Sequence, residues 1–180
     1  MKILGIAGSL RKGSYNKGVL RAAAEGSPED VQIEPFDLAK IPLFNQDIED
    51  PLPEPVKEFK QKVTEADAIY FATPEYNNSM SGVIKNAIDW GSRPMGDNSW
   101  DSKPVAVVSA SPSRLGGIKA QLALRQAFVF LNMHDIKQPE VVIANAMELF
   151  DEQGNLKDED TKKRIATQVE ALVEFAKKLT

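Results

Sequence analysis

The side chains best suited to chemistry gather in one short stretch near the start of the chain. Residues 8–16 read GSLRKGSYN, where Ser9, Ser14 and Asn16 offer hydroxyl and amide donors and Arg11 adds a fixed positive charge. The planar guanidinium of an arginine matches the oxygens of a phosphate group, to which it can donate two parallel hydrogen bonds. This combination of donors indicates a site for an anion, and we predict that the anion is a phosphate.

The elements on either side of this loop strengthen that prediction. The apolar run 3–7 is typical of a short buried strand, and the pattern from Lys17 to Glu25 is helical. Between a strand and a helix, backbone N–H groups and the positive end of the helix dipole converge on one point, and glycines let a ligand approach closely. The alternative interpretation is an ordinary polar turn that caps a helix.

The spacing of the glycines separates the kinds of phosphate ligand. Gly8 and Gly13 have the separation of a Walker A loop, but Ser14 occupies the position of its lysine and Lys12 lies before the second glycine. The dinucleotide fingerprint G-x-G-x-x-G is also missing, because Gly5 and Gly8 are too far apart. The loop therefore favours a terminal monophosphate over a triphosphate or a pyrophosphate.

The composition excludes several classes of function. The chain has 180 residues, 42% hydrophobic and 27% charged, with a formal net charge of -4 and no cysteine. Disulfides, thiolate catalysis and cysteine-ligated metals are excluded, and we expect no metal site. The charge balance indicates neither a nucleic-acid partner nor a membrane surface. A cysteine-free chain that enters a strand directly after Met1 and Lys2 leads us to expect a cytoplasmic protein.

Strands and helices alternate along the sequence. We predict strands at 2–7, 31–36, 68–73, 104–109 and 140–143, and helices at 14–25, 55–65, 81–91, 117–131 and 158–179. This alternation predicts an α/β protein, in which a parallel sheet is covered by helices on both faces. We expect one domain over residues 1–180, with strand order 2-1-3-4-5. The point where the order reverses lies between strands one and three, and ligands bind at such points.

A second polar loop would face the first one across this point. Residues 74–82 follow the third predicted strand and combine Pro74, an aromatic ring at Tyr76 and amides at Asn77 and Asn78. A flat aromatic ligand could pack on the ring while backbone groups hydrogen-bond its polar edge.

Together these segments resemble the NADPH-dependent FMN reductase family, which includes quinone, chromate and azo-dye reductases. The matching segments are GSLRKGS at 8–14 with Asn16, TPEYN at 73–77, VIKNAIDW at 83–90 with SRP at 92–94, and IPLFNQD at 41–47. The resemblance covers nearly the whole chain. It implies a flavodoxin-like fold with a five-stranded parallel sheet and a bound FMN.

The resemblance also implies roles for individual residues. Side chains that hold the phosphate would be Ser9, Arg11, Ser14 and Asn16; residues at the flavin ring would be Pro74, Glu75, Tyr76, Asn77, Asn78 and Ser111; and Gly116 and Gly117 match the family's glycine pair before the fourth helix. Two positions depart from the family: Ser81-Gly82 replaces Pro-Gly, and Ser113 replaces a frequent glycine. The departure at Ser113 affects the expected substrate preference more than the expected binding of FMN.

The implied activity is an NAD(P)H oxidoreductase. Hydride from NADPH or NADH would pass through FMN to a quinone, a free flavin, an azo dye or a chromate-type anion. No catalytic side chain is required, and His134, expected near the end of the fourth helix, is predicted to be structural. The resemblance further implies a homodimer or homotetramer, with the helix that carries Trp90 against a second subunit. Two alternatives remain open: a flavodoxin-type electron carrier without NAD(P)H activity, and a non-redox enzyme for a phosphate ligand.

Overall fold

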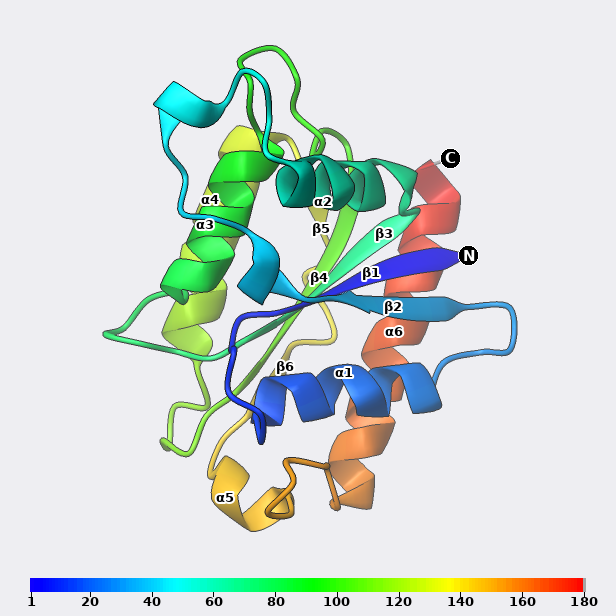
Figure 1. Cartoon of the computed structure of the whole chain (residues 1–180). Coiled ribbons are helices and arrows are strands. Elements are labelled where there is room, and N and C mark those ends of the chain that lie inside the picture. The colour runs from blue at the N-terminus through cyan, green and yellow to red at the C-terminus, as the bar shows by residue number, and fades with distance from the viewer. Residues whose placement is uncertain (180) are drawn as a thin grey trace.

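The apolar runs of the sequence form the centre of a parallel sheet. The computed structural model describes residues 1–179 (Figure 1). In it, β3 (Ala68–Thr73) and β4 (Pro104–Ala110) are buried at every position, and β1 (Lys2–Ala7) is buried from Ile3 onward. Strands that are buried on both faces are typical of a parallel sheet between two layers of helices.

Within residues 1–179 the sheet has six strands, where five were predicted. Its order is β2-β1-β3-β4-β5, with β6 also paired to β4, and this confirms the predicted order 2-1-3-4-5. β2 (Gln32–Phe36) forms one edge, and the other edge is divided between β5 (His134–Asp135) and β6 (Val141–Ile143), both parallel to β4. The predicted fifth strand corresponds to β6. Two residues are too few to show an alternation of polarity, so the sequence pattern did not reveal β5. His134, expected near the end of the fourth helix, begins this strand three residues after that helix ends at Leu131.

Helices cover both faces of the sheet, as predicted (Figure 1). α1 (Tyr15–Glu25) and α6 (Glu159–Leu179) pack on one face. α2 (Glu54–Glu65), α3 (Gly82–Gly91) and α4 (Ile118–Leu131) pack on the other. Each of these helices begins and ends within two residues of its predicted bounds.

Successive residues of the central strand enter the two cores in turn. Tyr70 points into the core under α6, where its hydroxyl donates to Gln168 Oε1 over 2.8 Å, and burial raises the pKa of Tyr70. Phe71 points to the opposite face, where its ring centroid lies 5.5 Å from that of Phe128. The alternation that a strand imposes on its side chains therefore builds both cores at once.

The long second connection is fastened to α3. It contains two short helical turns, η1 (Leu38–Lys40) and η2 (Gln46–Ile48). Between them, the Pro42 carbonyl accepts hydrogen bonds from Asn86 Nδ2 and Trp90 Nε1, each over 2.8 Å. Trp90 is fully buried and belongs to the core of its own chain. Among residues 1–179, no helix is both long and apolar enough to cross a membrane.

Candidate functional site

The two predicted loops meet at the carboxyl edge of the sheet. They enclose a hollow of about 320 Å³ between the ends of β1, β3 and β4. The predicted site residues that line it are Ser9, Arg11, Ser14, Asn16, Pro74, Glu75, Tyr76 and Ser111. Asn77, Asn78, Gly116 and Gly117 do not line it, and Tyr15, Ala110, Pro112 and Met147 do.

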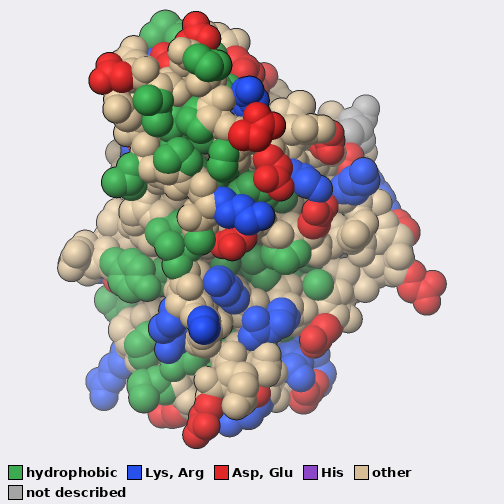
Figure 2. All heavy atoms as spheres, in the orientation of Figure 1, with side chains coloured by type: hydrophobic (Ala, Val, Ile, Leu, Met, Phe, Trp, Pro, Cys, Tyr) green, Lys and Arg blue, Asp and Glu red, His purple; other side chains and the backbone are tan. Residues whose placement is uncertain are grey.

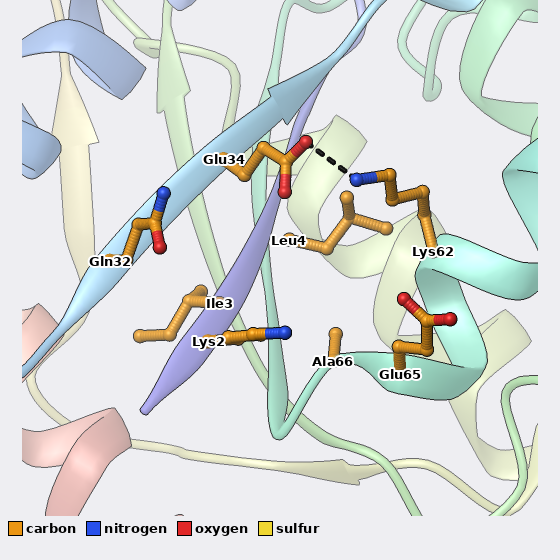
Figure 3. Close-up of a pocket in the computed structure, with 8 residues that line it drawn as sticks. All are labelled: Lys2, Ile3, Leu4, Gln32, Glu34, Lys62, Glu65 and Ala66. Atoms are coloured by element: carbon orange, nitrogen blue, oxygen red, sulfur yellow. Dashed lines mark hydrogen bonds and ion pairs between the residues drawn. The ribbon is translucent and has the colours of Figure 1, made fainter.

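A smaller hollow lies at the opposite, amino edge of the sheet (Figure 3). It is lined by the starts of β1 and β2 and by the end of α2, and an ion pair of 2.7 Å between Lys62 and Glu34 crosses it. Its volume of about 40 Å³ has room for about one water molecule. This hollow is therefore too small for an organic ligand.

The first loop presents the N-terminus of α1 to the hollow. Ser14 is the N-cap of α1, its Oγ accepts from the Lys17 N–H over 3.3 Å, and its own hydroxyl hydrogen remains available to a ligand. The first turn of α1 carries no acidic side chain, so its positive dipole end is not neutralised. This arrangement suits an anion.

Asn16 has a structural bond in addition to its predicted role. Its side-chain Nδ2 donates to the Ala110 carbonyl over 3.0 Å, and its Oδ1 accepts from the Ala110 N–H over 3.1 Å. The buried amide therefore joins the first loop to the end of β4. Direct contact of this side chain with a phosphate stays a prediction.

Arg11 lies at the rim of the hollow. Its guanidinium carbon is 4.9 Å from the centroid of the Tyr15 ring, which holds the cation against an aromatic face. Lys and Arg side chains gather over α1 and the loop before it (Figure 2). The basic residues of this segment are Arg11, Lys12, Lys17 and Arg21, so the field around the loop attracts an anion.

Gly8 allows the first loop to pass close to the second. A Cβ at this position would lie 2.4 Å from Ile84 Cδ1 and 2.8 Å from Pro74 Cδ. Only a glycine permits the backbone to approach the start of α3 at this distance.

The tip of the second loop is a tight two-residue turn. Tyr76 and Ser79 exchange two backbone hydrogen bonds, of 3.2 and 3.0 Å, and the residues between them have positive φ values, 51° at Asn77 and 61° at Asn78. Positive φ at both central positions is typical of a type I′ turn, which favours asparagine. The backbone of the turn thus accounts for both asparagines, and their contact with a flavin ring stays a prediction.

Glu75 connects the second loop to α4. The N-cap of α4 is Gly117, which has no side chain to cap the helix. The Glu75 carboxylate takes this role instead, because its Oε2 accepts from the N–H groups of Lys119 over 2.9 Å and Ala120 over 3.3 Å. The negative carboxylate at the positive end of a helix also stabilises it electrostatically.

We expect Glu75→Ala to lower the free energy of unfolding by about 1 kcal/mol, because the first turn of α4 loses its cap. Glu75→Gln retains a carbonyl oxygen as acceptor and should lose less. Urea denaturation measures both, with Glu170→Ala, an exposed site on α6, as the control. A Glu75→Ala protein as stable as the parent would contradict the capping role.

The loop after β4 closes the third side of the hollow. Ser111 Oγ accepts from the Ser113 N–H over 3.2 Å, so the family departure at Ser113 lies within a compact turn. The Ala146 N–H donates to the Ser111 carbonyl over 3.1 Å and begins α5 (Ala146–Leu149). Met147, in α5, therefore lines the hollow, although sequence reasoning missed it. Met147 follows the predicted strand 140–143, and this position was the one signal in the sequence that could have placed it at the carboxyl edge of the sheet.

The fold and the hollow together define a class of protein. A parallel sheet with this strand order, an anion-accepting first loop and a ligand hollow at the reversal of strand order is a flavodoxin-like fold. The family model of NADPH-dependent FMN reductases matches residues 1–148. The chain belongs to this family.

Individual relatives agree with this assignment. The chain is 45% identical over 180 residues to an NAD(P)H-dependent FMN reductase of Pseudomonas aeruginosa, covering 99% of this chain and 97% of the relative. It is 44% identical over 187 residues to an NAD(P)H:quinone oxidoreductase of Solanum tuberosum, covering 99% and 94%. Among solved structures, the flavoenzyme NAD(P)H:(acceptor) oxidoreductase FerB of Paracoccus denitrificans superimposes with a TM-score of 0.90 at 33% identity, covering 98% of this chain and 97% of that one.

The residues present fit FMN. The hollow joins a basic helix terminus without an acidic side chain in its first turn, suited to a monophosphate, to a loop that carries an exposed tyrosine ring, suited to a flat heterocycle. No group of three or more metal-binding side chains occurs within residues 1–179.

Proposed function

We propose that this protein is an FMN-dependent NAD(P)H oxidoreductase that passes electrons to a quinone-type acceptor. The observation that carries the proposal is the hollow between the basic loop and the tyrosine loop, at the reversal of strand order. The family assignment supports the cofactor, and the relatives named as quinone oxidoreductases support the class of acceptor.

The side chains bind and orient the cofactor. Ser9, Arg11 and Ser14 hold the phosphate at the start of α1, and Tyr76 packs against the ring. When FMN is bound, its ring system supplies the redox chemistry. No acid or base from the chain is needed in this proposal, and the single histidine, His134, lies in β5 outside the lining of the hollow.

A second hollow of about 410 Å³ adjoins the first at Tyr76. Its lining is largely apolar and includes Leu10, Ile41, Leu43 and Val83. A flat, weakly polar molecule such as a quinone gains more from such walls than a strongly hydrated anion does. This hollow therefore favours a quinone over a chromate-type acceptor.

An absorption spectrum under anaerobic conditions tests the function. We expect the purified protein to show flavin bands that bleach on addition of NADPH or NADH and return on addition of a quinone. The donor that bleaches them faster is the preferred one. Bands that bleach with dithionite alone would instead indicate a flavodoxin-type electron carrier, and a protein that binds no flavin after incubation with FMN would contradict the proposal.

We also propose that the protein is cytoplasmic, that residues 1–180 form one domain and that it assembles as a homodimer or homotetramer. The assembly is supported by large apolar side chains on the surface of α4, where Val129 is 83% and Phe130 is 89% exposed. Light scattering on the purified protein gives the mass of the assembly directly.

A further inference from the structure

The first loop rests on a turn that lies far away in the sequence. In this turn, residues 150–155, which we call the support turn, follow α5 and lie beside the start of α1 (Figure 1). Three glycines bring the two segments together. A Cβ on Gly154, where φ is +79°, would lie 2.9 Å from the Gly13 carbonyl oxygen, and a Cβ on Gly18 would lie 1.9 Å from the Gly154 oxygen. Backbone therefore packs directly on backbone.

Arg21 fastens the support turn to α1. Its Nη2 donates to the Gly154 carbonyl over 2.9 Å, and its Nε donates to Asn155 Oδ1 over 3.0 Å. Because the planar guanidinium donates from two of its nitrogens, it fixes the orientation of the support turn relative to α1 as well as the distance between them.

The support turn is also rigid within itself. The Asp151 carboxylate accepts from the Asn155 backbone N–H over 2.7 Å and from Asn155 Nδ2 over 3.0 Å. These hydrogen bonds, the one from the backbone first, hold the pKa of Asp151 below its usual value. The same asparagine thus closes the turn through Asp151 and accepts from Arg21.

A series of side-chain contacts leads from Phe150 in the support turn to Arg11 at the rim of the hollow. The Phe150 ring centroid lies 5.0 Å from that of Tyr15, and the guanidinium carbon of Arg11 lies 4.9 Å from the Tyr15 centroid. The support turn therefore contacts the backbone of the first loop directly, at Gly13. It contacts the Arg11 side chain of that loop only indirectly, through Tyr15.

We propose that the support turn is a positioning element for the FMN phosphate, with Arg21 and Asn155 as its positioning residues. Neither residue lines the hollow. The inference rests on the proposal that the first loop holds the phosphate. The turn lies outside residues 1–148, the part of the chain that the family model matches.

The physical reason is preorganisation. A loop that is already held in its binding conformation loses less conformational entropy when the ligand arrives, so the affinity for that ligand is higher. Arg21 and Asn155 act on the phosphate loop alone. Substitution of either residue should therefore weaken the contribution that the phosphate makes to the affinity for FMN, and should leave the contribution of the flavin ring unchanged.

The test compares FMN with riboflavin, which has the same ring and no phosphate. Flavin-free protein is titrated with each, and flavin fluorescence gives the two dissociation constants. We expect Asn155→Ala and Arg21→Gln to raise the dissociation constant of FMN by about five- to tenfold, the value of one or two hydrogen bonds, and to leave that of riboflavin unchanged. Gln153→Ala, in the same turn and exposed, is the matched control and should change neither.

Arg21→Lys separates positioning from charge. Lysine keeps the positive charge near the phosphate and loses the fork, so positioning predicts weaker FMN binding in this variant also. Full FMN affinity in Arg21→Lys and Asn155→Ala would overturn the inference, as would an equal loss for FMN and riboflavin. A parent protein that binds FMN and riboflavin equally would overturn the phosphate-loop assignment itself. A parent that prefers FMN, with variants that behave like it, would overturn only the role of the support turn.

Discussion

Replacing Arg11 with alanine is expected to weaken FMN binding by about 10- to 100-fold while the fold remains intact. A charge-assisted hydrogen bond contributes about 1.5–3 kcal/mol, which corresponds to that factor. The side chain is exposed at the rim of the hollow and its guanidinium lies against the Tyr15 ring, so its removal leaves no buried group without a partner. Titration of flavin-free protein with FMN measures the change.

Lys12 provides the matched control for Arg11. It is an exposed cation one residue further along the loop and does not line the hollow. If Arg11 contacts the phosphate directly, Lys12→Ala has a much smaller effect than Arg11→Ala. Equal effects would reduce Arg11 to a contributor to the general positive field, and an unchanged FMN affinity in Arg11→Ala would refute its assignment to the phosphate.

Gly18→Ala is expected to destabilise the protein by about 1–3 kcal/mol, the usual cost of forcing extra atoms into a packed region. Alanine in place of glycine inside a helix normally stabilises by about 0.5–1 kcal/mol. Here the new Cβ would lie 1.9 Å from the Gly154 carbonyl oxygen, a backbone atom that a rotamer change cannot move away. Either the support turn or α1 must shift. Chemical denaturation gives the free energy of unfolding.

Gly82→Ala is the control for this substitution. Gly82 is the first residue of α3, and a Cβ there would meet no heavy atom within 4 Å. We expect Gly82→Ala to leave the stability unchanged or to raise it slightly. A Gly18→Ala protein that gains stability as Gly82→Ala does would show that the contact between α1 and the support turn is not tight.

Local patterns were enough to predict the frame of the protein. The run 68–73 is apolar at nearly every position and became β3 with the predicted bounds, because a strand buried on both faces needs no polar side. The predicted helices 14–25 and 81–91 each begin one residue later than predicted, because Ser14 and Ser81 are their N-caps, whose hydroxyls accept from the backbone N–H three residues later. Alternation of strands and helices then determined the parallel sheet.

The same patterns could not reveal contacts between distant segments. The family resemblance implied that Glu75 lies at the flavin ring, which stays a prediction. The structure shows that its carboxylate caps α4, a helix that begins more than forty residues later. Asp151 to Asn155 had the composition of an ordinary turn, and only the folded chain brings it against Gly13 and Gly18. No local sequence pattern indicates such a contact between distant segments, because the residue's partner does not lie in the neighbouring sequence.

The sequence was therefore enough to predict which residues could bind a phosphate and a flat ring, since that depends on side-chain chemistry and on the elements immediately before and after each loop. The tertiary structure decided which of those residues share one hollow and which are occupied elsewhere. Asn16, bonded at both ends of its amide to Ala110, illustrates the difference. The physical reason is that a side chain's hydrogen-bonding capacity is local, whereas the partner that uses it is set by how the whole chain packs.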